Sequence, residues 1–162
     1  MKHDELLQML GAFAREKQAM LLRHQAGARH VAQYDANNTY QYVLAREDVH
    51  LDWLSRALES MGSTLETASE PDRPVSGKGE AAARTIFEED ARDAQAFYDR
   101  WHARVEGVTH ARHRLMLQVI LGEVLEHERF FEQAMAGRTD LLGRRTTESP
   151  VEGAVLASRW IE

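Results

Sequence analysis

Apolar residues recur at three- and four-residue steps along most of the chain, which is the spacing of one face of an α-helix. Ala, Leu, Glu, Arg and Gln dominate, and the sequence has no run of alternating β-branched residues. With 162 residues, a single hydrophobic core is the default expectation. The sequence therefore predicts an all-α protein with four long helices, at about 4–27, 35–61, 80–106 and 110–136.

The ends of these helices follow from capping residues and glycines. The first helix ends either at Gly27 or further on, near Gln33. Residues 35–39 favour helix N-caps, so they predict the start of the second helix, and Gly62 predicts its end. Thr109 is the expected N-cap of the fourth helix.

Residues 63–79 form the one long connection, with two of the three prolines. An extended segment of this length spans up to ~55 Å, more than the ~36 Å of a helix of about 24 residues. The short turn near residue 107 makes the third and fourth helices antiparallel neighbours. We expect an antiparallel four-helix bundle over 1–137, with one long crossover between the second and third helices. The tail, 138–162, is then either a short docked helix or a partner-binding segment.

Composition excludes several classes of protein. The chain has 20 basic and 26 acidic residues, a net charge of −6, which argues against binding nucleic acid through its phosphates. It has no cysteine, which excludes disulfides, thiolate zinc sites and iron–sulfur clusters. No stretch approaches the ~18 consecutive apolar residues of a membrane span, and the N-terminus lacks signal-peptide features. We therefore expect no membrane partner and a cytoplasmic location.

Ionisable side chains interrupt the apolar stripes of all four expected helices. A carboxylate buried alone is costly, so such groups are paired, protonated or bound to a cation. The convergence of carboxylates and imidazoles from separate helices predicts a metal site. Its candidate ligands are Glu16, Glu47, His50, Asp90, Glu123 and His127.

The segment from Glu47 to His50 has the Glu-x-x-His spacing. Residues three apart share a helix face, so this pair offers one oxygen and one nitrogen ligand to one metal ion. The same stripe continues with Leu54 and Leu58, which indicates that it faces inward. The alternative is a histidine packed between helices and a glutamate turned to solvent.

Asp90 and Glu123 are equally far from the turn at 106–107, so we expect them to lie at the same height. Two carboxylates that close repel each other strongly unless a cation lies between them. The alternative is that Asp90 lies at the edge of its stripe and pairs with an arginine such as Arg84 or Arg92.

Two positions leave alternatives open. On the fourth helix, Glu126 and His127 both reach the face of Glu123, and we favour His127, with a π-bulge as one way to aim it. On the first helix, Glu16 lies level with Glu47 if this helix ends near Gly27 and the second begins near Asp35. His24 is the candidate if that helix continues to about residue 33.

These residues make the chain resemble the ferritin-like superfamily, in the style of rubrerythrin and bacterioferritin, over roughly residues 4–136. The resemblance rests on Glu16, Glu47-x-x-His50, an acid on the third helix, and Glu123 to His127 followed by two phenylalanines. The chain departs from the family in having Asp90 where glutamate is usual. It also departs in the one-residue offset of His127 from the Glu-x-x-His spacing.

The resemblance implies two iron ions, with manganese as an alternative, that react with O₂ or peroxide. It implies a ferroxidase- or peroxidase-type oxidoreductase or an iron-handling protein, assembled as a homodimer or larger homo-oligomer. A second hypothesis is a metal-free or metal-altered ferritin-like bundle that serves as a binding or stress-associated protein. A third is an unrelated helical interaction module whose residues 155–161 dock a partner.

Overall fold

The computed structural model describes residues 2–69, 71, 73–75, 77–138 and 141–142. Its regular structure is all helical, with four helices and no strand among these residues. The helices are α1 (His3–Ala28), α2 (Tyr34–Ser60), α3 (Glu80–Glu106) and α4 (Ala111–Met135). The prediction of an all-α chain with four long helices is confirmed.

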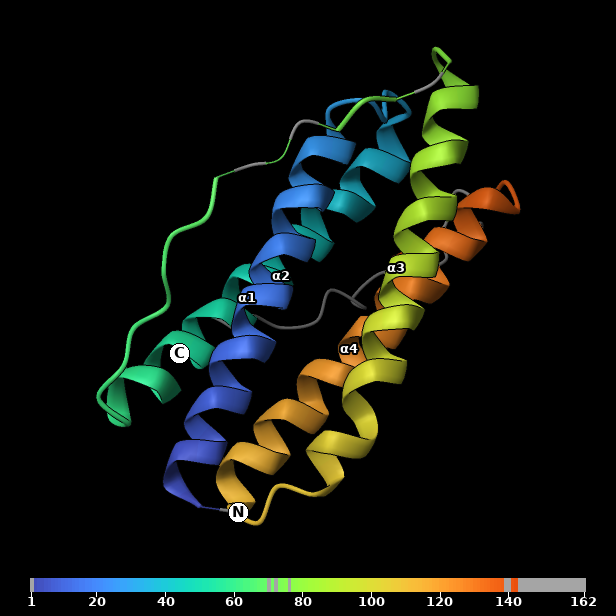
Figure 1. Ribbon diagram of the computed structural model, residues 1–162. Coiled ribbons are helices and arrows are strands. Elements are labelled where there is room, and N and C mark those ends of the chain that lie inside the picture. Colours follow the sequence, from blue (N-terminus) through green and yellow to red (C-terminus); the bar gives the residue numbers. More distant parts are fainter. Residues whose placement is uncertain (1, 70, 72, 76, 139–140, 143–162) are drawn as a thin grey trace, which may run out of the picture.

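The four helices lie side by side along one long axis (Figure 1). α1 packs mainly on α2, and α3 mainly on α4, while contacts between α2 and α4 and between α1 and α3 join the two pairs. The arrangement is consistent with a four-helix bundle. The connection from α2 to α3, green in Figure 1, runs along the outside of the helices from one end to the other.

The structure decides where α1 ends and where α2 begins. α1 ends at Ala28, next to Gly27, and α2 begins at Tyr34, one residue before the polar residues 35–39 that were expected to mark its start. These residues therefore lie inside the first turns of α2. One of them, Asn37, donates hydrogen bonds to the carbonyl oxygens of Ala28 (3.0 Å) and Val31 (3.1 Å). Its amide thus satisfies backbone groups at the end of α1 and in the turn.

The N-cap of α4 is corrected. His110 occupies that position instead of Thr109, and its Nδ1 accepts a hydrogen bond from the backbone N–H of His113 at 3.5 Å. α4 is α-helical from Ala111 to Met135, without the π-bulge considered above. Of the predicted tail, all but residues 138, 141 and 142 lies outside the described residues.

The interior contains two apolar clusters. The first includes Phe13, Phe97 and Trp101, and the ring centroid of Phe13 lies 5.0 Å from the centroids of the other two. The second includes Tyr40 and Phe131, whose ring centroids are 5.1 Å apart. Along each helix, buried polar residues occur near the boundary between these clusters. Among the described helices, none has the length and apolar character needed to cross a membrane.

Candidate functional site

A layer of polar side chains separates the two apolar clusters, and we call it the central polar layer. Every helix contributes to it, because each apolar stripe is interrupted by ionisable residues at inward positions. Six of its ionisable residues are at most 1% exposed. These are Lys17, His24, Glu47, His50, Asp90 and His127.

Glu47 is the carboxylate at the centre of this layer. Its Oε1 accepts a hydrogen bond from the Nζ of Lys17, and its Oε2 lies 2.8 Å from the Nδ1 of His24. Burial alone raises the pKa of a carboxyl group, but His24 and Lys17 hold the pKa of Glu47 well below its usual range. Burial lowers the pKa of His24, yet Glu47 and Asp90 outweigh it and leave that pKa raised. Glu47 is therefore an ionised carboxylate with Lys17 on one oxygen and His24 on the other.

Asp90 is held by a tyrosine and by an arginine from the connection. The hydroxyl of Tyr40 donates to Oδ2 at 2.6 Å, and the Nη2 of Arg73 lies 2.8 Å from Oδ1. Arg73 also donates to the backbone carbonyl of Arg23 at 2.9 Å. Burial and the Asp90 charge raise the pKa of Tyr40 well above its usual value, so the hydroxyl keeps its proton. The arginine that pairs with Asp90 is thus Arg73, rather than Arg84 or Arg92.

Glu123 has its own cation. Arg46 donates to it through Nε at 2.8 Å and through Nη2 at 2.5 Å, and the Nε2 of His50 lies 2.9 Å from its Oε2. Burial raises the pKa of Glu123, but Arg46 and His50 together outweigh it and leave that pKa lowered. Asp90 and Glu123, predicted to meet, therefore have separate partners.

His127 differs from the other members of the layer. It is 1% exposed, and neither ring nitrogen has a hydrogen-bond partner. Burial lowers its pKa to about 3, and burial together with Lys17 lowers the pKa of His50 to about 4. The two rings stack with centroids 6.4 Å apart, and Nδ1 of His50 also lacks a partner. Both histidines are neutral at pH 7 and present unused ring nitrogens.

The structure places four of the six predicted ligands inside the central polar layer, one at its edge and one outside it. Glu47, His50, Asp90 and His127 are buried in the central polar layer, and Glu123 lies at its edge with a side chain 20% exposed. Glu126, the alternative to His127, is exposed. His24, the alternative on the first helix, binds Glu47.

Glu16 lies outside the central polar layer. Its side chain is 40% exposed and accepts hydrogen bonds from Nε1 of Trp101 and from Nε of Arg100, the latter at 3.1 Å. The condition that sets Glu16 level with Glu47 is met, because α1 ends at Ala28 and α2 begins at Tyr34. Successive helical residues point about 100° apart, however, and Lys17 is the one that faces Glu47.

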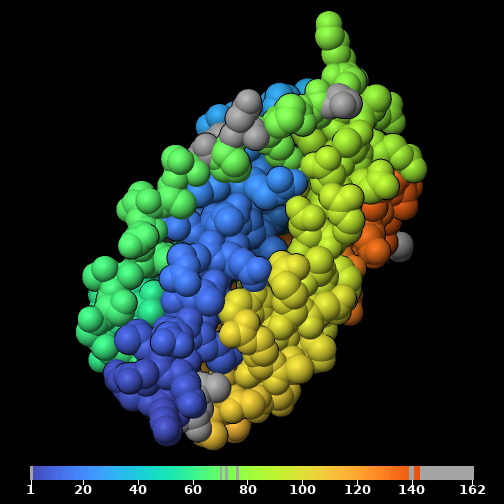
Figure 2. Space-filling model, in the orientation of Figure 1, coloured from blue at the N-terminus to red at the C-terminus, as the bar shows by residue number. Residues whose placement is uncertain are grey.

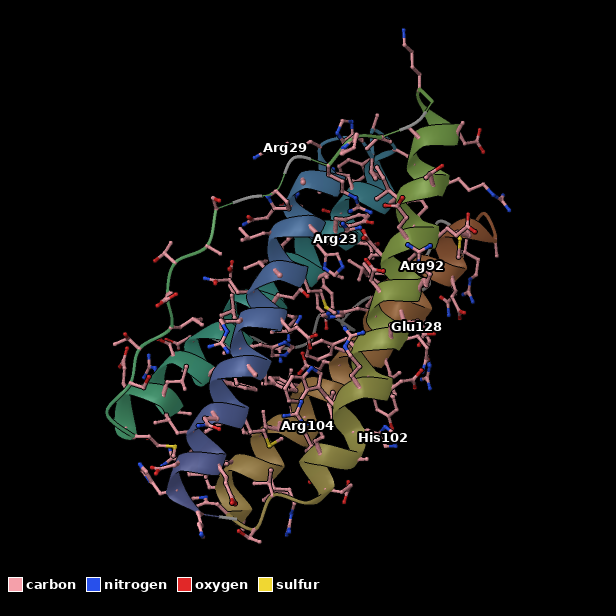
Figure 3. All side chains as sticks on the ribbon, viewed as in Figure 1. Arg23, Arg29, Arg92, His102, Arg104 and Glu128 are labelled. Carbon is pink, nitrogen blue, oxygen red and sulfur yellow. The ribbon has the colours of Figure 1, made fainter. Side chains whose placement is uncertain are left out.

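A groove between α1 and α3 leads toward this layer. It has a volume of about 270 Å³, and both His24 and Asp90 contribute to its lining. Figure 2 shows the surface hollowed between these helices, blue and yellow-green. At its rim Arg23 reaches from α1 toward α3, where its Nε lies 3.2 Å from Asp93 (Figure 3).

The residues present do not fit a pair of metal ions. Each of the three inward carboxylates already has a side-chain cation: Lys17 on Glu47, Arg73 on Asp90 and Arg46 on Glu123. Two divalent ions would have to displace these cations or add their charge to a layer whose ion pairs already balance. Within the described ranges, no group of three or more His, Cys, Asp or Glu side chains could hold a metal ion.

Comparison of the chain with models of protein families, with curated proteins and with solved structures gives no match. The resemblance to ferritin-like proteins thus stays a prediction from the residues. What the central polar layer does has to be inferred from its own geometry and charges.

Proposed function

We propose that the chain is a ferritin-like bundle in which side-chain cations have taken the place of the metal ions. It then works as a metal-independent binding protein rather than as a di-iron oxidoreductase. The observation that supports this proposal is that Glu47, Asp90 and Glu123 each have an internal cation. Such ion pairs hold the four helices together without a cofactor, and they leave no carboxylate free to ligate two ions.

The proposed topology is antiparallel, with one long crossover between α2 and α3. The support for the crossover is the path of the connection along the outside of the helices (Figure 1). The support for the antiparallel order is the short turns between α1 and α2 and between α3 and α4, which make sequential helices neighbours.

A surface suited to a partner lies between α2 and α4. A depression of about 390 Å³ is lined in part by Trp53, Met116 and two exposed apolar residues, Leu115 (60% exposed) and Val119 (48%). Apolar groups gathered at a surface hollow favour association with another protein surface. A second copy of this chain is the partner that we propose, in a homodimer or larger assembly.

The di-iron oxidoreductase is the second candidate function. The observation that favours it is His127, a buried histidine whose two ring nitrogens have no partner. Neutral imidazole is a common ligand of iron and zinc, and an unsatisfied buried polar group needs an explanation. This candidate requires Lys17 to leave Glu47 when metal binds.

Iron oxidation separates the two candidates. We expect the wild-type protein, mixed with Fe(II) in air, to oxidise it no faster than protein-free buffer, because the carboxylates are already paired. The measurement is the rise in ferric absorbance, with Glu47→Ala and Glu123→Ala as matched variants. Acceleration by the wild type that both variants abolish would establish the oxidoreductase and refute the binding protein.

A further inference from the structure

The side chain of Arg73 fills a polar site between α1 and α3, although Arg73 itself belongs to the connection between α2 and α3. Its Nη1 donates to the backbone carbonyl of Arg23 at 2.9 Å and to Oδ2 of Asp90 at 3.1 Å. Its Nη2 lies 2.8 Å from Oδ1 of Asp90, 3.1 Å from Oε2 of Glu89 and 3.4 Å from the carbonyl oxygen of Ile86. Only 3% of the Arg73 side chain is exposed. All of these acceptors belong to the helices, and the connection supplies the cation.

The helices shape this site for a planar, forked group. Asp90 offers both carboxylate oxygens to Arg73, and the hydroxyl of Tyr40 holds that carboxylate in place by donating to Oδ2 at 2.6 Å. Gly27 of α1 leaves the space that the fork needs, because a Cβ at that position would overlap Nη1 of Arg73. A guanidinium can give two N–H groups to one carboxylate, whereas an ammonium is a compact point charge. The site therefore selects a guanidinium over other cations by shape.

Arg73 does not use this site completely. Its Nε is buried and has no hydrogen-bond partner, and a buried N–H without an acceptor costs free energy. Because Arg73 is tied to the connection, the chain fixes the direction from which its guanidinium meets the acceptors. A guanidinium group that is not tied in this way can bind the same oxygens and turn its remaining N–H groups elsewhere. Exchange of Arg73 for such a group therefore recovers part of this cost.

We propose that this site binds a guanidinium group of a ligand, either a small alkylguanidine or the arginine side chain of another protein, and that Arg73 occupies it as an internal competitor. The ligand takes the two oxygens of Asp90, Glu89 adds a second negative charge, and the segment around Arg73 moves away. The net charge of −6 favours the approach of such a cation. This inference rests on the proposed function, since it takes Asp90 to pair with a guanidinium and not with a metal ion.

The test uses Arg73→Ala, which empties the site, and ethylguanidine, which supplies the atoms that the substitution removes. We expect ethylguanidine to bind this variant with a dissociation constant of about 1 mM, and at about 10 mM to raise its melting temperature by about 3–6 °C. Ethylammonium at the same concentration should raise it by less than about 1 °C, because it lacks the fork. The wild type should bind ethylguanidine at least about tenfold more weakly, because Arg73 competes. Isothermal titration calorimetry with EDTA present measures both affinities.

Arg73→Ala/Asp90→Asn is the matched control. It keeps the space but removes the charge, so we expect it to lose ethylguanidine binding. If Arg73→Ala is unfolded alone, because Asp90 is left without its cation, ethylguanidine should restore its helical circular dichroism. Agmatine and N-acetyl-argininamide separate the two sources of the group. Tighter binding of agmatine to Arg73→Ala supports a small molecule, and tighter binding of the capped arginine supports an arginine of another protein.

Three results overturn the inference. They are no binding or refolding of Arg73→Ala by ethylguanidine, equal binding by the wild type, and equal binding by Arg73→Ala/Asp90→Asn. Each of them leaves the proposed function intact, because that function is tested by iron oxidation in the wild type. Iron oxidation that depends on Glu47 and Glu123 would refute the proposed function, whatever ethylguanidine does.

Discussion

Glu47→Gln is expected to lower the free energy of unfolding by about 3–5 kcal/mol, the cost of removing one partner from a buried ion pair. Lys17 and Glu47 are both fully buried, so water cannot replace the lost carboxylate. The amide keeps an acceptor for Lys17 but leaves its charge uncompensated among neutral groups. Urea denaturation followed by circular dichroism measures the change.

Asp48→Asn is the control for this substitution. Asp48 is the next residue of α2, and it is exposed. We expect it to change the free energy of unfolding by less than about 0.5 kcal/mol. The double variant Lys17→Met/Glu47→Leu should recover most of the stability, because apolar side chains of similar volume can replace a buried pair. Equal stability of Glu47→Gln and Asp48→Asn would contradict the importance of this pair.

Asp90→Asn is expected to cost about 3 kcal/mol and to loosen the connection between α2 and α3. Asp90 holds the hydroxyl of Tyr40 and the guanidinium of Arg73, and Arg73 is the residue that ties the connection to the interior. Arg73 keeps a second partner, Glu89, at 3.1 Å, which limits the loss. Hydrogen exchange should be faster in peptides covering residues 63–75.

The control is Asp93→Asn, nearly one turn further along α3. Asp93 is about one-third exposed and pairs with Arg23, so we expect a cost of at most about 1 kcal/mol and unchanged exchange in the connection. Slow exchange of residues 63–75 in both variants would show that Arg73 does not anchor the connection through Asp90.

The sequence predicted the four helices because the signal for each is local. The third helix was predicted at 80–106, and α3 spans Glu80–Glu106. The glycines that bound this helix lie directly beside it, and its apolar stripe lies within it, so both can be found from the local sequence. The start of α2 was less certain, because the N-capping residue types at 35–39 spread over several positions, and one of them, Asn37, binds the end of α1. A single side chain that acts on a neighbouring helix leaves no local signal.

The candidate site was predicted less completely. Periodicity placed Glu47, His50, Asp90 and His127 on inward faces, and all four are buried. Their role as metal ligands stays a prediction. Glu16 and His24 were the candidates on the first helix because a carboxylate or an imidazole is the expected ligand, and Lys17 was not among them. The spacing of Phe13, Lys17 and His24 is nevertheless compatible with Lys17 on the inward stripe.

The arginines of the site were harder to predict. Arg73 lies in the connection, where no periodicity fixes which residue faces the interior. Arg46 lies on α2 beside Glu47 in sequence, on the face that neighbours α4. From the sequence we expected a metal ion to balance the charge of these carboxylates. In the structure, lysine and arginine side chains pair with them instead. Pairings between residues far apart in sequence depend on how the helices pack.

The metal content of the purified wild-type protein tests the central claim most directly. The protein is incubated anaerobically with Fe(II) or Mn(II), freed of unbound metal and analysed by elemental analysis, beside Glu47→Ala and Glu123→Ala. Internal ion pairing predicts no more iron or manganese in the wild type than in either variant. Stoichiometric iron or manganese that is present in the wild type and lost in both variants would contradict it.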